Sequence, residues 1–295
     1  MAEVGELSVR KEPAGGAVAD HVQVLGAVRP QGRRSLVVLI HGYANSQATA
    51  CGSFDNCIRN LETAASQSNS NLISPVFKFY WPGDTKLPVI SQLSYPWEIG
   101  PAENSAAKLS TFLQGLAGPG ATPVEIHFVS HSLGGRVVLE TLKHFVAAGA
   151  NCPVLFRSMS LMAGAVPVHM AGDPQKLQPA ALIPGRRQVL FSSSDLVLMI
   201  AFRLGETLAR EGFFPEAVGS YGHPNGLWQQ QNLKGYEHWD YWPSALAARY
   251  LGNFLDLPVT VPPPPNMIAE RASAEERSLP VATIPNRGLP VRSLP

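Results

Sequence analysis

The segment Val129–Gly135 constrains the fold of this chain more than any other part of its sequence. It reads Val-Ser-His-Ser-Leu-Gly-Gly and follows the apolar run 124–129, which has the pattern of a largely buried strand. Apolar residues then recur at helical spacing, at Leu133, Val137, Val138, Leu142, Phe145 and Val146. A chain that turns sharply from a strand into a helix has room only for small side chains two positions either side of the tip. Ser130 and Gly134 occupy those positions, so the pattern predicts a strand–turn–helix with Ser132 at its tip.

The predicted position of Ser132 suits a nucleophile. It lies at the N-terminus of a helix, where unpaired backbone N–H groups and the helix dipole favour negative charge. A serine there can attack a carbonyl group, and the resulting oxyanion is held beside it. Ser130 stands where the pattern usually has glycine, which is a departure of one Cβ atom. A simpler interpretation, a turn of small residues that only links a strand to a helix, stays open.

Composition indicates a globular domain. The chain has 295 residues, of which 45% are hydrophobic and 15% charged, which suits a sizeable core. The net charge of +1 and the lack of a basic block argue against a nucleic-acid partner. No apolar run is long enough for a transmembrane segment, and residues 1–20 lack the apolar core of a signal peptide, so we expect a soluble, cytoplasmic protein. The cysteines, Cys51, Cys57 and Cys152, are expected to be free thiols, with a Cys51–Cys57 bridge as the alternative.

Strands and helices are predicted to alternate along the chain. Apolar runs predict strands at 22–28, 36–40, 76–81, 124–129, 157–163 and 188–192. Helical spacing predicts helices from about Ser53, over Glu103–Leu116, after Ser132 and from Pro243. This order is typical of an α/β fold with a mostly parallel central sheet and helices on both faces. The active sites of such sheets lie beyond the carboxyl ends of the strands.

The sequence predicts three regions. Residues 1–20 are mixed, charged and glycine-rich, and we expect a flexible N-terminal segment there. Residues 21–257 are expected to form the α/β domain. Residues 258–295 include the run Pro262–Pro265 and lack the apolar content to pack, so we expect a flexible tail. A polyproline motif that contacts another protein is the alternative for this tail.

A serine hydroxyl is a poor nucleophile at neutral pH, and it needs a base that is oriented by a carboxylate. In sites built on such a turn, the acid and then the base follow the serine in the sequence. Asp195 comes just after the predicted strand 188–192 and is the candidate acid, although an aspartate there also suits the N-cap of a helix. His238, directly before the last predicted helix, is the candidate base. His223, in a loop with glycine and proline, is the alternative.

The oxyanion needs a second backbone donor from the loop after an earlier strand. The predicted strand 36–40 ends in His41-Gly42, and the glycine lets the backbone approach a ligand closely. We therefore assign the two donors to the backbone N–H groups of Tyr43 and Leu133. Taken alone, His41-Gly42 would be an ordinary turn after a strand.

These segments together resemble the α/β-hydrolase superfamily. The resemblance is carried by His41-Gly42-Tyr43, residues 130–135, Asp195 and His238, and it covers roughly residues 22–255. Residues 79–84 and 193–198 are also similar to a bacterial branch of esterase- and lipase-like hydrolases of largely unassigned substrate. The resemblance implies a sheet of about eight strands, a covalent acyl-enzyme, and neither a cofactor nor a metal.

The expected activity is that of a serine hydrolase acting on carboxylic esters, either small molecules or lipid-like. A thioesterase, an amidase or an acyltransferase with the same triad stays open, as does a non-catalytic hydrolase-like binding domain. The substrate pocket is expected to include Trp81, Tyr95, Trp97, Leu196 and Met199. The apolar cluster after Asp195 would equally suit a plain core.

Overall fold

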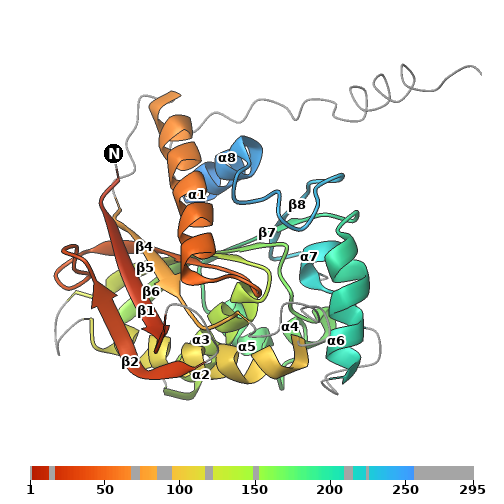
Figure 1. Cartoon of the computed structure of the whole chain (residues 1–295), viewed down its shortest axis with the longest axis horizontal. Coiled ribbons are helices and arrows are strands. Elements are labelled where there is room, and N and C mark those ends of the chain that lie inside the picture. Colours follow the sequence, from red (N-terminus) through yellow and green to blue (C-terminus); the bar gives the residue numbers. More distant parts are fainter. Residues whose placement is uncertain are drawn as a thin grey trace, which may run out of the picture. The chain divides into compact units, whose positions relative to one another are not determined.

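The computed structural model describes residues 2–12, 17–67, 74–84, 95–116, 122–148, 153–208, 215–223 and 226–255. One compact unit spans Met1–Thr260. In its described part, eight strands form one sheet in the order β2-β1-β4-β3-β5-β6-β7-β8 (Figure 1). The strands are β1 (Val4–Arg10), β2 (Val18–Leu25), β3 (Ser35–Ile40), β4 (Val76–Tyr80), β5 (Val124–His131), β6 (Val154–Met162), β7 (Arg186–Phe191) and β8 (Gln229–Asn232). The pair β1–β2 is antiparallel and every other neighbouring pair is parallel, which confirms the predicted fold class.

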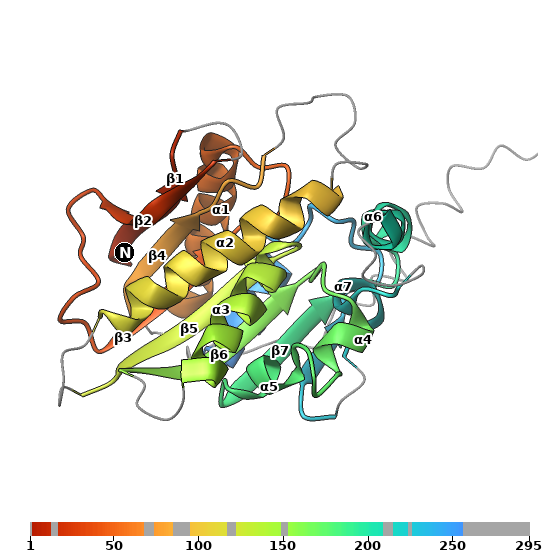
Figure 2. The ribbon, with the colours of Figure 1, turned by 90° about the horizontal axis from the view of Figure 1, so that it is seen from below.

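Helices cover both faces of this sheet. They are α1 (Gln47–Gln67), α2 (Tyr95–Gln114), α3 (Gly134–Ala148), α4 (Val168–Ala171), α5 (Gln178–Leu182), the π-helix η1 (Val197–Phe202), α6 (Arg203–Leu208), α7 (Val218–Tyr221) and α8 (Ala245–Phe254). Helices α1 and α8 pack together on one face, whereas α2 and α3 pack together on the other (Figure 2). The parallel strands β3, β5, β7 and β8 end at the same edge of the sheet, and the loops that carry the predicted site residues follow them there.

The central strands form where the sequence has continuous apolar runs. Residues 36–40 of β3 and all of β4 are buried, as parallel strands covered on both faces must be. The apolar stripe predicted for α1 is buried too; it consists of Phe54, Ile58, Leu61 and Ala65. A continuous apolar run therefore corresponds here to a strand at the centre of the sheet, because both faces of such a strand are buried.

The N-terminal segment differs from its prediction. Val4–Arg10 forms β1, which pairs with both β2 and β4, instead of a flexible segment through residue 20. Leu7 and Val9 are fully buried in this strand. The charge of Arg10 made β1 hard to predict, because a charged residue is seldom buried unless it is paired. Here Arg10 is buried and forms an ion pair with Asp84.

Two helices begin earlier than predicted. Helix α1 begins at Gln47, where the Ser46 Oγ accepts a hydrogen bond of 3.2 Å from the backbone N–H of Thr49 and caps the helix. Helix α2 begins at Tyr95 and runs through Pro101.

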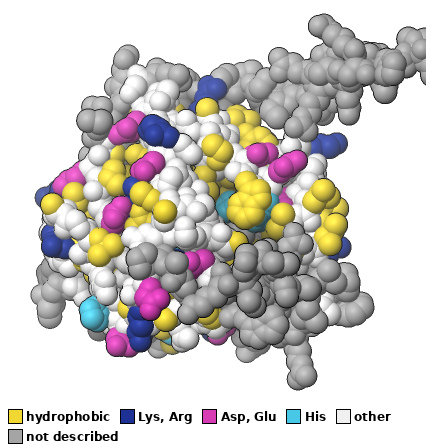
Figure 3. All heavy atoms as spheres, in the orientation of Figure 1, with side chains coloured by type: hydrophobic (Ala, Val, Ile, Leu, Met, Phe, Trp, Pro, Cys, Tyr) yellow, Lys and Arg dark blue, Asp and Glu magenta, His cyan; other side chains and the backbone are white. Residues whose placement is uncertain are grey.

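The surface of the described residues mixes both signs of charge. Figure 3 shows lysine and arginine side chains interspersed with aspartate and glutamate on one face. Within the described ranges, no helix is long and apolar enough to cross a membrane. Cys51 and Cys57 are free thiols. Cys152 and the predicted proline-rich tail lie outside the described residues.

Candidate active site

Ser132 lies at the tip of the turn between β5 and α3. Its φ angle is +53°, in the left-handed region that residues other than glycine rarely adopt. Such strain persists only where the surrounding structure holds it. The backbone N–H of Ser132 donates to the Met162 carbonyl and the N–H of Ala165 donates to the Ser132 carbonyl, each at 3.0 Å. These bonds to the end of β6 hold the turn in its strained form.

The glycines at this turn allow two loops to approach closely. A Cβ atom on Gly134 would lie 2.5 Å from the His41 carbonyl oxygen, and one on Gly42 would lie 2.7 Å from the Ser132 Cβ. Neither position therefore has room for a side chain. Ser130, in contrast, fits inside β5, where its hydroxyl donates a hydrogen bond of 3.4 Å to the Ser160 carbonyl. The serine at this position therefore leaves the turn intact.

The side chains of Ser132, His238 and Asp195 form a continuous line of hydrogen bonds. The His238 Nε2 atom lies 2.9 Å from the Ser132 Oγ, and the His238 Nδ1 atom lies 2.8 Å from the Asp195 Oδ2. All three residues are buried, and Asp195 is fully so. A buried carboxylate accepts the Nδ1–H, so the Nε2 lone pair of the imidazole faces the hydroxyl. This arrangement can remove the hydroxyl proton as the oxygen attacks.

Asp195 also caps the helix that follows it. Its Oδ1 accepts a hydrogen bond of 3.0 Å from the backbone N–H of Leu198, while its Oδ2 contacts His238. Asp195 therefore caps this helix and contacts the candidate base at the same time. The Ser192 hydroxyl, just past β7, donates to the Tyr236 carbonyl at 2.8 Å and ties the loop of the acid to the loop of the base.

His223, the alternative base, lies elsewhere. Its ring stacks on Trp228 with the centroids 4.6 Å apart, and its backbone N–H donates to the Gln230 side chain at 2.9 Å. Burial lowers the pKa of its imidazole. The structure thus brings His238, and not His223, into contact with Ser132.

Both residues assigned as oxyanion donors adjoin Ser132: Leu133 follows it in the chain, and Tyr43 borders the same cavity. Leu133 immediately precedes α3, and a backbone N–H at this position has no acceptor within the helix. In the loop after β3, the Gly42 carbonyl accepts a hydrogen bond of 2.8 Å from the His41 Nδ1. Carbonyl and N–H point to opposite sides of a trans peptide, so the N–H of Tyr43 is directed away from His41.

A cavity of about 140 Å³ opens beside Ser132 and His238. Its lining is mostly apolar and comprises Tyr43, Ala44, Ser132, Ala165, Val197, Leu198, Ala201, Phe202, His238 and Trp239. Both Ser132 and Tyr43 border this cavity, so a group bound there would lie next to the candidate nucleophile and one assigned oxyanion donor.

The predicted pocket residues differ from this lining. Trp81 is fully buried behind the site, where it stacks on His41 with the centroids 5.6 Å apart. Leu196 and Met199 are exposed and do not line the cavity. Tyr95 and Trp97 begin α2, and their side chains lie outside the described part of the chain.

The π-helix η1 explains why the sequence missed the lining residues. Val197, Leu198, Ala201 and Phe202 face the cavity from this short element, directly after Asp195. A π-helix has a wider turn than an α-helix, is rare, and occurs frequently at functional sites. Apolar residues occupy every position from 196 to 202, so the sequence has no polar face that would reveal which side is turned inward.

Comparison with known proteins gives one family match. Residues 18–221 match a family described as "Alpha/beta hydrolase of unknown function (DUF900)". The matched range includes Ser132 and Asp195 and ends before His238. No curated protein matches the chain.

Several solved structures share a similar chain trace. An arylesterase is 14% identical, with 78% of each chain covered and a TM-score of 0.41. A hyperthermophilic esterase from the archaeon Pyrobaculum calidifontis is 12% identical, with 79% of this chain and 80% of that chain covered and a TM-score of 0.41. Acyl-protein thioesterase 2 of Zea mays is 16% identical, with 84% and 96% covered and a TM-score of 0.34. At this distance the likeness carries nothing about substrate.

Proposed function

The chain belongs to this family of α/β hydrolases, and from that membership we propose that it is a serine hydrolase that cleaves carboxylic esters through an acyl-serine intermediate. The observation that carries the proposal is the line of hydrogen bonds from Asp195 through His238 to Ser132. A lone buried serine would have no means of losing its proton at neutral pH.

The first step is acylation of Ser132. The Ser132 Oγ attacks the ester carbonyl carbon while its proton passes to the His238 Nε2, and the carbonyl oxygen becomes an oxyanion. When this intermediate collapses, the bond to the leaving alcohol breaks and His238 returns the proton to the alkoxide oxygen. Asp195 stabilises the imidazolium that exists between these two proton transfers.

The backbone N–H groups of Tyr43 and Leu133 are proposed to bind the oxyanion. One such donor contributes about 100- to 1000-fold to kcat, because its hydrogen bond strengthens as negative charge develops on the oxygen. The N-terminus of α3 adds the field of the helix dipole at the same place.

The second step releases the acid. A water molecule loses a proton to the His238 Nε2 and attacks the acyl carbon, and collapse of the second oxyanion returns that proton to the Ser132 Oγ. The free enzyme is restored without any other reactant. The chemistry of the step is therefore hydrolysis.

The cavity indicates a short apolar acyl group. Its lining from η1 is apolar. Since an apolar cavity of about 150 Å³ holds a benzene ring, we expect acyl chains of about four to six carbons to fit best.

A labelling experiment tests the proposal. Wild-type protein, Ser132→Ala and a control variant, Ser110→Ala, are treated with a fluorophosphonate probe and assayed with 4-nitrophenyl butyrate. Ser110 is also buried, but its hydroxyl donates to Ala107 within α2. We expect labelling and hydrolysis in the wild type and in Ser110→Ala, and loss of both in Ser132→Ala. Full activity of folded Ser132→Ala would refute the nucleophile.

A matched substrate panel tests the ester preference. Butyryl oxoester, thioester and anilide are compared at equal concentration, with glycerol as an alternative acceptor to water. Hydrolysis of the oxoester with the highest kcat/KM is the expected result. If the protein is labelled at Ser132 but turns over only the thioester or the anilide, or transfers the acyl group to glycerol, the serine mechanism stands and the ester assignment fails.

A further inference from the structure

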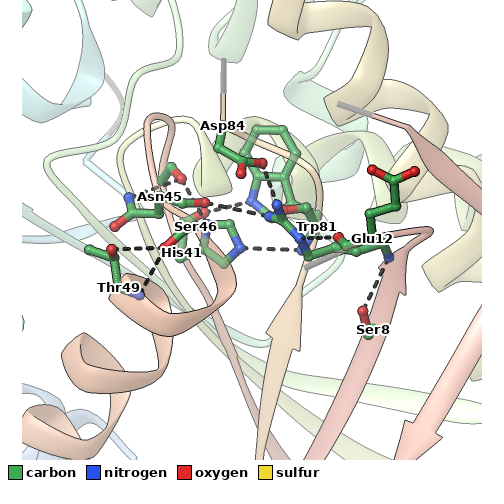
Figure 4. A network of polar contacts seen from close by, with 10 residues as sticks. Ser8, Glu12, His41, Asn45, Ser46, Thr49, Trp81 and Asp84 are labelled. Carbon is green, nitrogen blue, oxygen red and sulfur yellow. Dashed lines mark hydrogen bonds and ion pairs between the residues drawn. The ribbon is translucent and has the colours of Figure 1, made fainter. Parts of the chain in front are cut away.

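The loop between β3 and α1 is held from behind by a network of polar contacts (Figure 4). This loop, residues 41–46, is called the oxyanion loop below. The network joins it to the end of β4 and to the end of β1, the N-terminal strand. These contacts do not involve Ser132, Asp195 or His238. The network therefore has no part in the mechanism described above.

Three successive carbonyl groups at the start of the oxyanion loop accept hydrogen bonds within this network. The His41 carbonyl accepts a hydrogen bond of 2.8 Å from the Trp81 Nε1. The Gly42 carbonyl accepts from the His41 Nδ1 at 2.8 Å and from the Asn45 Nδ2 at 3.2 Å. The Tyr43 carbonyl accepts from the same Asn45 Nδ2 at 2.9 Å. Because the Gly42 carbonyl is held in this network, the N–H of Tyr43, on the other side of the same trans peptide, is directed away from it.

Arg10 joins the parts of this network. Its guanidinium donates to the Trp81 carbonyl at 2.8 Å and to the Asn45 carbonyl at 3.4 Å, and it forms an ion pair with Asp84. Its side chain is 1% exposed and that of Asp84 is 12% exposed. The planar guanidinium can bind several acceptors at once in fixed directions, which an ammonium group cannot do.

The imidazole of His41 transmits this arrangement to the Gly42–Tyr43 peptide. Its Nδ1–H donates to the Gly42 carbonyl, and its Nε2 accepts a hydrogen bond of 3.2 Å from the backbone N–H of Trp81. Burial lowers the pKa of His41 to about 4, and the positive charge of Arg10 acts in the same direction. The neutral ring therefore keeps one donor and one acceptor, as both hydrogen bonds require.

We propose that Arg10 is a positioning residue for the oxyanion hole: it fixes the Trp81 and Asn45 carbonyls and so keeps the Tyr43 N–H turned toward Ser132. The left-handed backbone of Ala44, with a φ of +59°, is the strained point that this network holds in place. The inference rests on the proposed function, because it takes the Tyr43 N–H as an oxyanion donor.

The experiment compares Arg10→Met and Arg10→Lys with a control, Arg157→Met. Arg157 is exposed and forms an ion pair with Glu125 near the N-terminal ends of β5 and β6. Ser132 follows the other, C-terminal end of β5. Three quantities are measured on each folded protein: kcat per fluorophosphonate-titrated site, KM for 4-nitrophenyl butyrate, and the Kd of butylboronic acid, which forms a tetrahedral adduct with serine. The backbone amide signal of Tyr43 is followed by NMR after labelling with [¹⁵N]tyrosine and is assigned with Tyr43→Phe.

A misplaced Tyr43 N–H should weaken binding of the transition state and leave binding of the substrate unchanged. For Arg10→Met we expect kcat per site to fall about 10- to 100-fold with KM unchanged, because the donor is lost only in part. Butylboronic acid should bind more weakly by the same factor, and the Tyr43 amide signal should move or split. Arg10→Lys should lie between, and Arg157→Met should match the wild type in every measurement.

The outcomes separate this inference from the proposed function. Unchanged kcat per site, or an unchanged Tyr43 amide signal, in folded Arg10→Met overturns the role of Arg10 even if the protein is an active serine hydrolase. If Arg10→Met does not fold, Asp84→Asn takes its place and is expected to shift the same quantities in the same direction; no shift there overturns the inference. If the wild type is neither labelled nor active, the proposed function fails, while the Tyr43 amide signal still reports whether Arg10 holds the loop.

Discussion

The Nε2–H of His131 donates a hydrogen bond of 2.7 Å to the backbone carbonyl of His238. The residue before the candidate nucleophile thus holds the backbone of the candidate base. The two imidazole rings also contact each other, with their centroids 4.9 Å apart. Burial lowers the pKa of His131 to about 3, and the neighbouring His238 acts in the same direction, so His131 is neutral at neutral pH.

Replacing His131 should loosen the base without removing it. In His131→Phe the ring volume is retained but the donor to His238 is lost. A single hydrogen bond of this kind contributes about 0.5–1.5 kcal/mol, so we expect kcat to fall up to about tenfold with little change in KM. The measurement is steady-state hydrolysis of 4-nitrophenyl butyrate. His144→Phe, on the exposed side of α3, serves as the control and should retain the wild-type kcat; an unaltered kcat in His131→Phe would contradict the role.

The buried histidines should make the fold sensitive to acid. His41 and His131 have folded pKa values of about 4 and about 3, against 6.5 for an unperturbed histidine. Below pH 6.5 the unfolded chain binds protons that the folded protein does not, so the free energy of unfolding is highest above that pH and decreases as the pH falls toward 4 and then 3. Each such proton changes stability by about 1.4 kcal/mol per pH unit. Urea unfolding at pH 7, 5.5 and 4.5 measures this slope, and His131→Phe should reduce it; an equal slope in that variant would contradict the prediction.

The paired glycines after Ser132 should respond in opposite directions. A Cβ at Gly134 would meet the His41 carbonyl at 2.5 Å, whereas the nearest atom to a Cβ at Gly135 lies 3.5 Å away. We expect Gly134→Ala to destabilise the protein by about 1–3 kcal/mol and to abolish activity, because the oxyanion loop must move away. Gly135→Ala, within α3, should be neutral or more stable by about 0.5–1 kcal/mol. Urea unfolding and kcat check both, and equal effects would show that the close approach does not matter.

The acyl-chain preference should follow the cavity wall. Ala201→Leu would place three more carbons into the space that we assign to the acyl group. Because each methylene excluded from an apolar site costs about 0.8 kcal/mol, exclusion of three should lower kcat/KM for the hexanoyl ester about 60-fold relative to the acetyl ester. Ile200→Leu, on an exposed neighbouring residue, is the control. If the ratio of kcat/KM for the hexanoyl ester to that for the acetyl ester is the same in Ala201→Leu and the wild type, η1 is not part of the acyl site.

The sequence predicted the elements whose signals are local. A sharp turn requires small residues, and these are visible around Ser132. A strand that is buried on both faces requires a continuous apolar run, such as Leu36–Ile40. Asp195 and His238 could be found because the order of the elements determines which loops meet at one edge of the sheet. Each of these inferences needed only neighbouring residues and the alternation of strands with helices.

Other parts were missed because distant contacts determine them. β1 includes a buried arginine whose partner, Asp84, lies far along the chain. β8 is a polar strand, Gln-Gln-Gln-Asn, at the edge of the sheet, where pairing with β7 and not side-chain burial defines it. The cavity lining depends on the wide turn of η1, which an apolar segment does not reveal.

The position of Arg10 bears on where the working unit of this protein begins. The family match starts at residue 18 and stops at residue 221. A fragment trimmed to those limits would keep Ser132 and Asp195, but it would lack the histidine that contacts them and the arginine behind the oxyanion loop. Any shortened version intended for assay must therefore retain the first strand as well as the loop that carries His238, or its inactivity would say nothing about the chemistry.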